Sequence, residues 1–228
     1  MTARSTETTS WIKAYDWMKE EIESGRAKMG EQLPEMSLVK KIGVSRTPIR
    51  EAMRVLEQEG YIKIVSNKGA FVSEISIEDI KEIYELRKLL EPFAALSAAA
   101  RISDGDIASM ENEWKSLNRM FKRAGKADLS RVAALDIKLH MTIAYNAANR
   151  RIGAIISSYH VQIKRFQRLS VQSLDDTQNS IDQHLRIIEC LKKRNPEELR
   201  LCLYNHIVDS EGYIMKGYFL PCYDSSAK

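Results

Sequence analysis

The apolar residues of this chain change their spacing between residues 73 and 78, and no other feature constrains the fold as much. Before this point two short segments, 61–65 and 70–73, have the apolar pattern of strands. After it the strand pattern stops, and apolar residues recur at the spacing of helices. The sequence therefore predicts two domains, a small one over residues 11–74 and an all-helical one over residues 78–220.

Three helices are expected before the two strands, over about 11–24, 35–41 and 45–59. Gly43 and Val44 form a tight turn, and Ser45 can cap the third helix. Pro48 is tolerated because it falls in the first helical turn, where backbone N–H groups lack an intrahelical partner. In the second helix the apolar residues are expected to face inward: Met36, Leu38, Val39 and Ile42. Three helices followed by a hairpin with its turn at 66–69 is the order of a winged helix-turn-helix.

The rest of the chain is expected to be a small polar tail and a helical bundle. Residues 1–10 are small and polar and are predicted to form a flexible tail. The apolar spacing predicts further helices over about 76–100, 103–124, 128–147, 151–169, 180–193 and 196–217. The fold class is therefore mainly α, with a winged helix-turn-helix followed by an all-α helical bundle.

Polar and basic residues at the start of the third helix suit DNA. Ser45, Arg46, Thr47 and Arg50 lie in its first turns, the part of a recognition helix that reaches base edges in the major groove. Arginine can bind guanine through two hydrogen bonds, which discriminates by roughly 1–3 kcal/mol per base. Asn67 and Lys68 in the turn between the strands can contact the DNA backbone or the minor groove. The alternative is that these are solvated charges, and the net charge of +4 does not decide between the two.

The stretch from Gly30 to Ala52, with its core Gly-Val-Ser-Arg-Thr-Pro-Ile-Arg-Glu-Ala, closely resembles the signature of the GntR family of bacterial regulators. The segments 56–62 and 67–72 resemble that family's helix end and wing. The resemblance implies a DNA-binding transcriptional regulator rather than an enzyme, with DNA contacts from Ser45, Arg46, Thr47, Arg50, Asn67, Lys68 and Gly69. The sequence departs from the pattern at Val39, where alanine is usual, and at Met36, where some members carry a DNA-contacting arginine.

The second domain contains all four histidines of the chain, at positions 140, 160, 184 and 206. Asp136 and His140 are four residues apart and share one helix face with apolar neighbours. His184 and His206 lie among apolar residues on two later predicted helices. A carboxylate and three imidazoles from three helices would suit Zn²⁺ or another divalent ion. From spacing alone, hydrogen-bonded core histidines are the alternative.

Residues 78–217 resemble the FCD effector domain of one large GntR subgroup. The resemblance implies that Asp136, His140, His184 and His206 hold a divalent metal, with Zn expected first and Ni, Mn or Fe as alternatives. It also implies a small carboxylate effector, for which Arg87 is the candidate guanidinium. A surface or interdomain salt bridge of Arg87 with Glu82 or Glu91 is the alternative. His160 matches no ligand position and is expected to be structural or exposed.

The expected partners are a pseudo-palindromic double-stranded DNA operator and a second copy of the chain in a homodimer. Two rival functions stay open at this point, a metalloenzyme that uses the Asp/His₃ set and a regulator that senses the metal itself. The start of the chain lacks the apolar core of a secretory signal, and no apolar run is long enough to cross a bilayer, so a cytoplasmic location is expected. Three cysteines, Cys190, Cys202 and Cys222, without a CxxC pattern are expected to be free thiols.

Overall fold

The structure is a computed structural model that describes residues 3–74, 76–126, 128–169 and 174–219. It contains two compact units, residues 1–76 and residues 77–228. The division falls within the interval 73–78, where the apolar spacing of the sequence changes.

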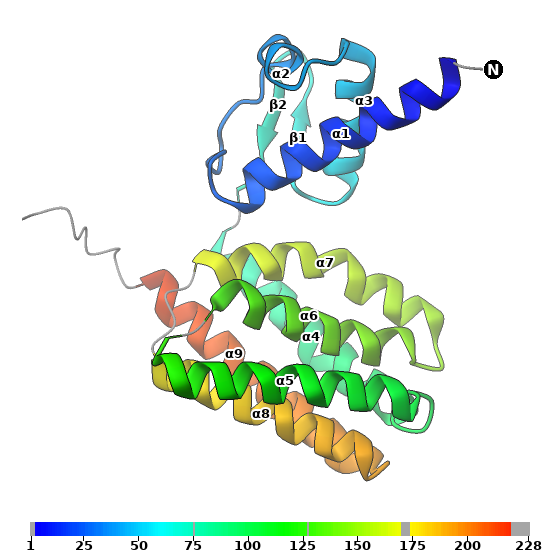
Figure 1. Cartoon of the computed structure of the whole chain (residues 1–228), viewed down its shortest axis with the longest axis vertical. Helices are drawn as coiled ribbons and strands as arrows, with labels where there is room; N and C mark the ends of the chain where they lie inside the picture. The colour runs from blue at the N-terminus through cyan, green and yellow to red at the C-terminus, as the bar shows by residue number, and fades with distance from the viewer. Residues whose placement is uncertain (1–2, 75, 127, 170–173, 220–228) are drawn as a thin grey trace, which may run out of the picture. The chain divides into compact units, whose positions relative to one another are not determined.

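The first unit contains three helices and a two-stranded hairpin (Figure 1). In chain order these elements are α1 (Ala3–Glu23), α2 (Glu35–Ile42), α3 (Arg46–Gln58), β1 (Ile62–Val65) and β2 (Gly69–Val72). The prediction of a flexible tail over residues 1–10 is wrong from Ala3 onward, because α1 already begins there. Small polar residues such as serine and threonine are only mildly unfavourable in a helix, so a helix that packs further along can extend through them.

The turn between α2 and α3 follows from the residues at its two ends. Gly43 ends α2 in the left-handed region at φ 74°, which costs glycine no Cβ contact. Pro48 and Ile49 are buried in the first turns of α3, and α3 packs against α1. The prediction that Met36 faces inward is wrong, since this residue is 48% exposed. The buried face of α2 consists of Leu38 and Ile42.

The wing is an antiparallel hairpin in which Ile62 pairs with Val72 and Val65 with Gly69. The turn needs positive φ at Asn67 (59°) and at Gly69 (98°), which asparagine and glycine tolerate best. Gln32 adds an isolated bridge to Phe71, so the segment before α2 is fastened to the hairpin.

All regular secondary structure in the described residues of the second unit is helical (Figure 1). The helices are α4 (Ile77–Ala98), α5 (Asp104–Ala124), α6 (Leu129–Tyr145), α7 (Arg150–Leu169), α8 (Leu174–Lys192) and α9 (Pro196–Phe219). Helix α4 packs against α9, α6 and α7, and α8 packs against α5 and α9. The predicted fold class, mainly α with a winged helix-turn-helix and a helical second domain, is confirmed.

Side-chain caps set several helix ends of this bundle. Ser103 accepts a hydrogen bond from the backbone of Asp106, and Asp128 accepts one from Arg131, as expected for N-caps. Helix α8 starts at Leu174, earlier than the predicted residue 180. The segment between these positions is polar and looks like a loop in sequence, yet Thr177 and Ser180 are buried against neighbouring helices.

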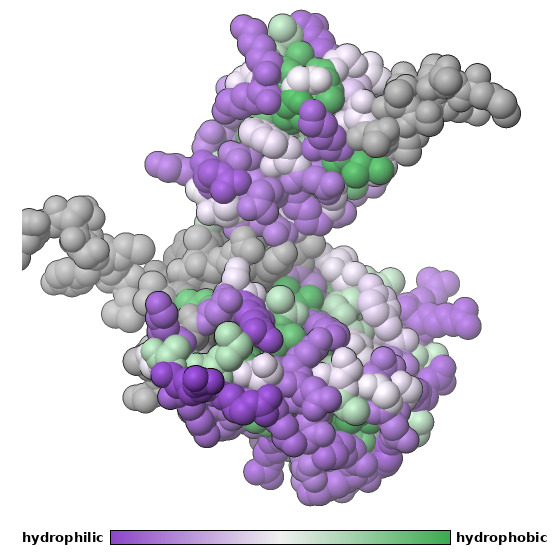
Figure 2. Space-filling model, in the orientation of Figure 1, coloured by the Kyte–Doolittle hydropathy of each residue, from purple (hydrophilic) through white to green (hydrophobic). Residues whose placement is uncertain are grey.

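Hydrophilic side chains cover most of the face of the second unit that Figure 2 shows, with smaller hydrophobic areas between them. Among the described residues, no helix is both long and apolar enough to cross a membrane.

Candidate metal centre and DNA-binding face

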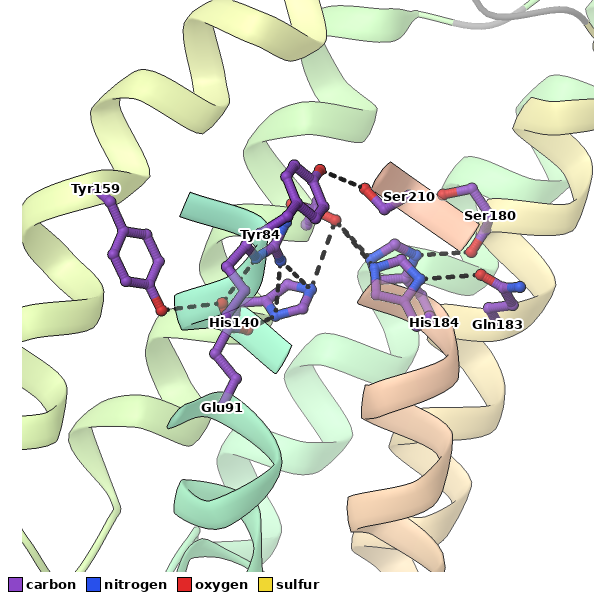
Figure 3. A network of polar contacts seen from close by, with 11 residues as sticks. Tyr84, Glu91, His140, Tyr159, Ser180, Gln183, His184 and Ser210 are labelled. Atoms are coloured by element: carbon purple, nitrogen blue, oxygen red, sulfur yellow. Dashed lines mark hydrogen bonds and ion pairs between the residues drawn. The ribbon is translucent and has the colours of Figure 1, made fainter. Parts of the chain in front are cut away.

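The structure brings together the four residues predicted as metal ligands. Asp136 and His140 come from α6, His184 from α8 and His206 from α9, and all four are buried. One potential ligand atom of each lies within 4.8 Å of those of the other three. Three separate helices therefore direct one carboxylate and three imidazoles to one point inside the bundle (Figure 3).

The imidazoles meet at one oxygen of Asp136. The Nε2 atoms of His184, His206 and His140 lie 3.0, 3.5 and 3.6 Å from Oδ1 of Asp136. The i, i+4 spacing on α6 places His140 beside Asp136, and the packing of α8 on α9 brings the other two rings to them. These distances leave the Nε2 atoms facing a common centre.

The other ring nitrogen of each histidine is held by an acceptor outside this centre. Nδ1 of His184 lies 2.6 Å from the backbone oxygen of Ser180, and Nδ1 of His206 lies 3.0 Å from Oε1 of Gln183. Nδ1 of His140 donates to Oε2 of Glu91. A proton on Nδ1 leaves the Nε2 lone pair for a metal, which is the usual arrangement around metal-bound histidines.

The donor set fits a divalent metal ion. Nε2 of His206 is buried and has no hydrogen-bond partner, which is costly without a ligand of some kind. Burial raises the pKa of Asp136, but the neighbouring His140 and His184 outweigh this and hold the pKa well below its usual value. Burial, with the neighbouring His184, lowers the pKa of His206 to about 3, so its imidazole is neutral near pH 7. A carboxylate at Asp136 and a neutral imidazole at His206 are protonation states that suit metal coordination.

A second polar layer from α4 lies behind His140. Nε of Arg87 forms an ion pair with Oε1 of Glu91 at 2.8 Å, and both side chains are buried. Nη2 of Arg87 lies 3.3 Å from Nδ1 of His140, whereas Nη1 is buried without a hydrogen-bond partner. Tyr159 of α7 donates a hydrogen bond of 3.3 Å to Glu91. Arg87 thus pairs with Glu91, one of the two partners considered from the sequence, but the ion pair is buried inside the helical bundle and not at a surface or domain boundary.

Sequence reasoning missed the residues that orient the histidines. Glu91 was considered only as a partner of Arg87, and Ser180 and Gln183 carried no signal apart from their nearness to His184. Trp114 of α5 stacks on the ring of His184 with centroids 3.9 Å apart. The fourth histidine, His160 on α7, is 5% exposed and lies outside the cluster, with neither ring nitrogen hydrogen-bonded.

A narrow hollow leads to the cluster from between α6, α8 and α9. It is lined by residues that include Leu129, Val132, Asp136, Ser180, His206 and Tyr213. Its water-accessible volume is about 20 Å³, which is room for roughly one water molecule. An organic molecule can therefore enter only when side chains at this hollow move.

The predicted DNA-contacting residues of the helix-turn-helix are all exposed. Ser45 is the N-cap of α3 by backbone conformation, but its side chain makes no capping hydrogen bond. Nη2 of Arg46 lies 2.8 Å from the sulfur of Met36, and Nε of Arg50 forms an ion pair with Glu35 at 2.8 Å. Residues of α2 thus hold both arginines on the outer side of the helix-turn-helix, and the sequence analysis did not anticipate these two partners.

The predicted wing residues Asn67, Lys68 and Gly69 are exposed as well. The backbone N–H of Lys68 donates to the carbonyl of Val65 at 3.0 Å, and the carbonyl of Lys68 accepts from Gln32 at 2.8 Å. The tip of the wing is therefore fixed through its backbone, while the Lys68 side chain is exposed.

A winged helix-turn-helix with exposed arginines on its recognition helix, joined to a helical domain with a buried Asp/His cluster, defines a DNA-binding transcriptional regulator. Comparison with known families agrees with this class. Residues 13–72 match the model "Bacterial regulatory proteins, gntR family", and residues 82–209 match the model "FCD domain". The chain belongs to the GntR family of bacterial regulators, in the group that carries an FCD domain, and this family consists of transcriptional regulators and not enzymes.

Relatives of the same family match nearly the whole chain, and a solved structure shares its fold. The chain is 28% identical over 202 residues to the HTH-type transcriptional regulator YdhC of Bacillus subtilis, covering 87% of this chain and 89% of that protein. It is 25% identical over 197 residues to the gluconate operon transcriptional repressor of Bacillus licheniformis, covering 84% and 79%. The structure of McbR/YncC from E. coli has the same fold, with a TM-score of 0.75, 18% identity and coverage of 92% and 98%.

Proposed function

We propose that this regulator binds its operator with an affinity set by a small carboxylate metabolite, which binds at a divalent metal in the helical domain. The observation that carries the proposal is the convergence of three Nε2 atoms on Asp136, with every Nδ1 engaged by an acceptor. A metal ion that takes five or six ligands would have a position beyond the Asp/His₃ set for a further oxygen ligand.

Asp136, His140, His184 and His206 would hold the metal. Zn²⁺ suits a set of three imidazoles and one carboxylate best, and Ni²⁺, Mn²⁺ and Fe²⁺ suit it as alternatives. The metal would supply a Lewis-acidic position for a carboxylate oxygen. Arg87 would supply charge close by, since its Nη1 is buried without a hydrogen-bond partner beside His140. The naming of one relative for the gluconate operon is consistent with a sugar acid or hydroxy acid as effector.

The small size of the hollow supports a link between effector binding and conformation. A molecule larger than water must displace side chains of α6, α8 or α9 to reach the ligands. Such a displacement would alter how these helices pack, and a coupling of about 1–3 kcal/mol changes operator affinity roughly 5- to 150-fold.

Two copies of the chain would bind a pseudo-palindromic operator, one recognition helix in each of two successive major grooves. An apolar stripe on α4 supports a homodimer. Leu86, Leu89 and Phe93 lie on one helix face and are 42%, 71% and 60% exposed. Large apolar side chains gathered at helical spacing on a surface mark an interaction site, and we assign this one to the second copy. The location would be the cytoplasm, where the operator is.

Fluorescence anisotropy with a labelled duplex, selected by the purified protein from a random library, tests the proposal. We expect that gluconate or another small hydroxy acid shifts operator affinity at least severalfold in metal-loaded protein, and not after metal removal. The variant Arg87→Met should lose the response while it still binds the duplex. A shift that follows metal concentration with no organic acid present would instead establish a metal sensor. No response to either metal or acids would refute the proposed control of DNA binding.

A further inference from the structure

Two cysteines of the helical domain face each other across the α8–α9 hairpin. Cys190 lies near the end of α8, and Cys202 lies in the second turn of α9, which follows after a short connection. Their sulfur atoms are 3.4 Å apart. The two helices pack against each other along this region, so their packing holds the two thiols in contact.

The two thiols differ in access. Cys190 is fully buried, whereas Cys202 is partly exposed. Cys202 lines a surface hollow together with Gln183, Arg186, Glu198 and Asn205. Arg186 lines the same hollow, and the neighbouring Cys202 raises the pKa of its guanidinium. A partly exposed thiol beside a fixed positive charge is the environment of a reactive cysteine, because the cation stabilises the thiolate.

We propose that Cys202 and Cys190 form a peroxide-sensing thiol pair that closes to a reversible disulfide. In the first step the Cys202 thiolate attacks one oxygen of hydrogen peroxide, the O–O bond breaks, and a sulfenic acid and hydroxide form. In the second step the Cys190 sulfur attacks the Cys202 sulfur, the S–O bond breaks, and the released hydroxide takes up the Cys190 proton as water. In total two thiols and one peroxide give one disulfide and two waters, so the thiols lose the two electrons that the peroxide gains.

The order of the two steps follows from the environment of each thiol. Burial raises the pKa of Cys190 to about 12, and the neighbouring Cys202 and Glu198 contribute in the same direction. Cys190 is therefore protonated near pH 7 and out of reach of solvent peroxide. Cys202 reacts first because it is accessible and lies beside Arg186. Cys190 is then the resolving thiol, already in contact with the sulfur that it must attack.

Closing the bond needs only a small movement. The sulfur atoms must approach from 3.4 Å to the usual disulfide length of about 2.0 Å. The bond would join the two helices that carry His184 and His206, and Gln183, which holds His206, lines the same hollow as Cys202. The thiol pair itself needs no metal, so this inference goes beyond the proposed effector control and stands or falls separately from it.

The test is peroxide treatment of the reduced full-length protein, followed by alkylation of the remaining thiols and mass analysis of a non-reducing tryptic digest. Trypsin separates the two cysteines because Lys192, Lys193 and Arg194 lie between them. We expect two of the three thiols to resist alkylation, one disulfide-linked peptide pair containing Cys190 and Cys202, and full reversal by dithiothreitol.

Variants separate the roles of the residues. Cys222→Ser should leave the linkage unchanged, whereas Cys190→Ala should leave a sulfenic acid on Cys202 that dimedone traps. Cys202→Ser should leave Cys190 unoxidised, and circular dichroism checks that each variant is folded. Arg186→Gln should slow oxidation by roughly threefold to tenfold, because the positive charge beside the Cys202 sulfur is lost. A linkage through Cys222, or over-oxidation of Cys202 with no link to Cys190, would overturn the proposal.

Discussion

Glu91 accepts a hydrogen bond from Nδ1 of His140 with one carboxylate oxygen and forms an ion pair with Arg87 through the other. The three side chains are buried, so one acidic group on α4 both orients a candidate metal ligand and neutralises a buried guanidinium. A change at Glu91 is therefore expected to affect both the orientation of His140 and the stability of the helical domain.

Glu91→Gln should therefore weaken metal binding and destabilise the helical domain. The amide keeps the shape but loses the charge that makes His140 a stronger ligand, and we expect metal affinity to fall about 10- to 100-fold. Arg87 is left as a buried charge without its partner, which costs about 3–5 kcal/mol of unfolding free energy. Chelator competition and urea unfolding measure the two effects. Glu82→Gln, an exposed change on the same helix, is the control and should alter neither.

The metal centre itself is tested by metal analysis of the purified protein. The wild type should contain about one equivalent of a divalent ion, and Asp136→Asn, His140→Ala and His184→Ala should each lose it while staying folded. His160→Ala is the matched histidine control, because His160 lies outside the cluster, and should retain the metal. Absence of metal from the wild type even after reconstitution would reduce the four residues to a polar core.

Arg46→Ala should weaken binding to the selected operator by roughly 5- to 150-fold, the equivalent of losing about 1–3 kcal/mol of base recognition. The specificity should relax at one base pair, since other contacts of α3 are unchanged. Anisotropy titrations on the operator and on single-base variants measure both effects. Arg119→Ala removes an exposed arginine from α5 of the helical unit and should leave the affinity unchanged. Equal affinities of Arg46→Ala and wild type would disprove the recognition-helix assignment.

Lys68 at the tip of the wing is expected to contact phosphate rather than a base. Lys68→Ala should weaken binding to all duplexes by a similar factor and should reduce the slope of log affinity against log salt by about 1. Titrations at several salt concentrations measure the slope. A loss confined to one operator sequence would mean that the lysine reads a base instead.

We expect the buried His160 to reduce the folding stability of the protein in acid. Burial lowers its pKa to about 4 in the folded protein, against an ordinary value of 6.5. Between these values the unfolded chain binds a proton that the folded chain does not, so folding stability falls as the pH decreases from about 6.5 to 4. At pH 5 the contribution is roughly 2 kcal/mol.

Urea unfolding of wild type and His160→Phe at pH 7 and pH 5 isolates this effect, since the other titrating groups are common to both proteins. The variant should lose less stability than the wild type between the two pH values. Equal losses would mean that His160 is protonated in the folded protein.

The order of the elements and the type of each element could be read from the sequence. Apolar spacing, the glycine after α2 and the caps at Ser103 and Asp128 act over a few residues, so their consequences are local. The i, i+4 pair Asp136 and His140 belongs to the same category, because one helix alone places both on a shared face.

Only the tertiary structure decided which distant groups meet. His184 and His206 reach Asp136 through the packing of α8 and α9, and no short-range pattern encodes that approach. The same holds for the partners of Arg46 and His140, which are Met36 and Glu91, and for the contact of Cys190 with Cys202. The helix α8 starts before the predicted residue because Thr177 and Ser180, two of the polar residues in its first turns, are buried, and burial outweighs their low helix propensity. The sequence by itself thus determined the order of helices and strands, because these depend on neighbouring residues, whereas packing between helices determined the candidate site.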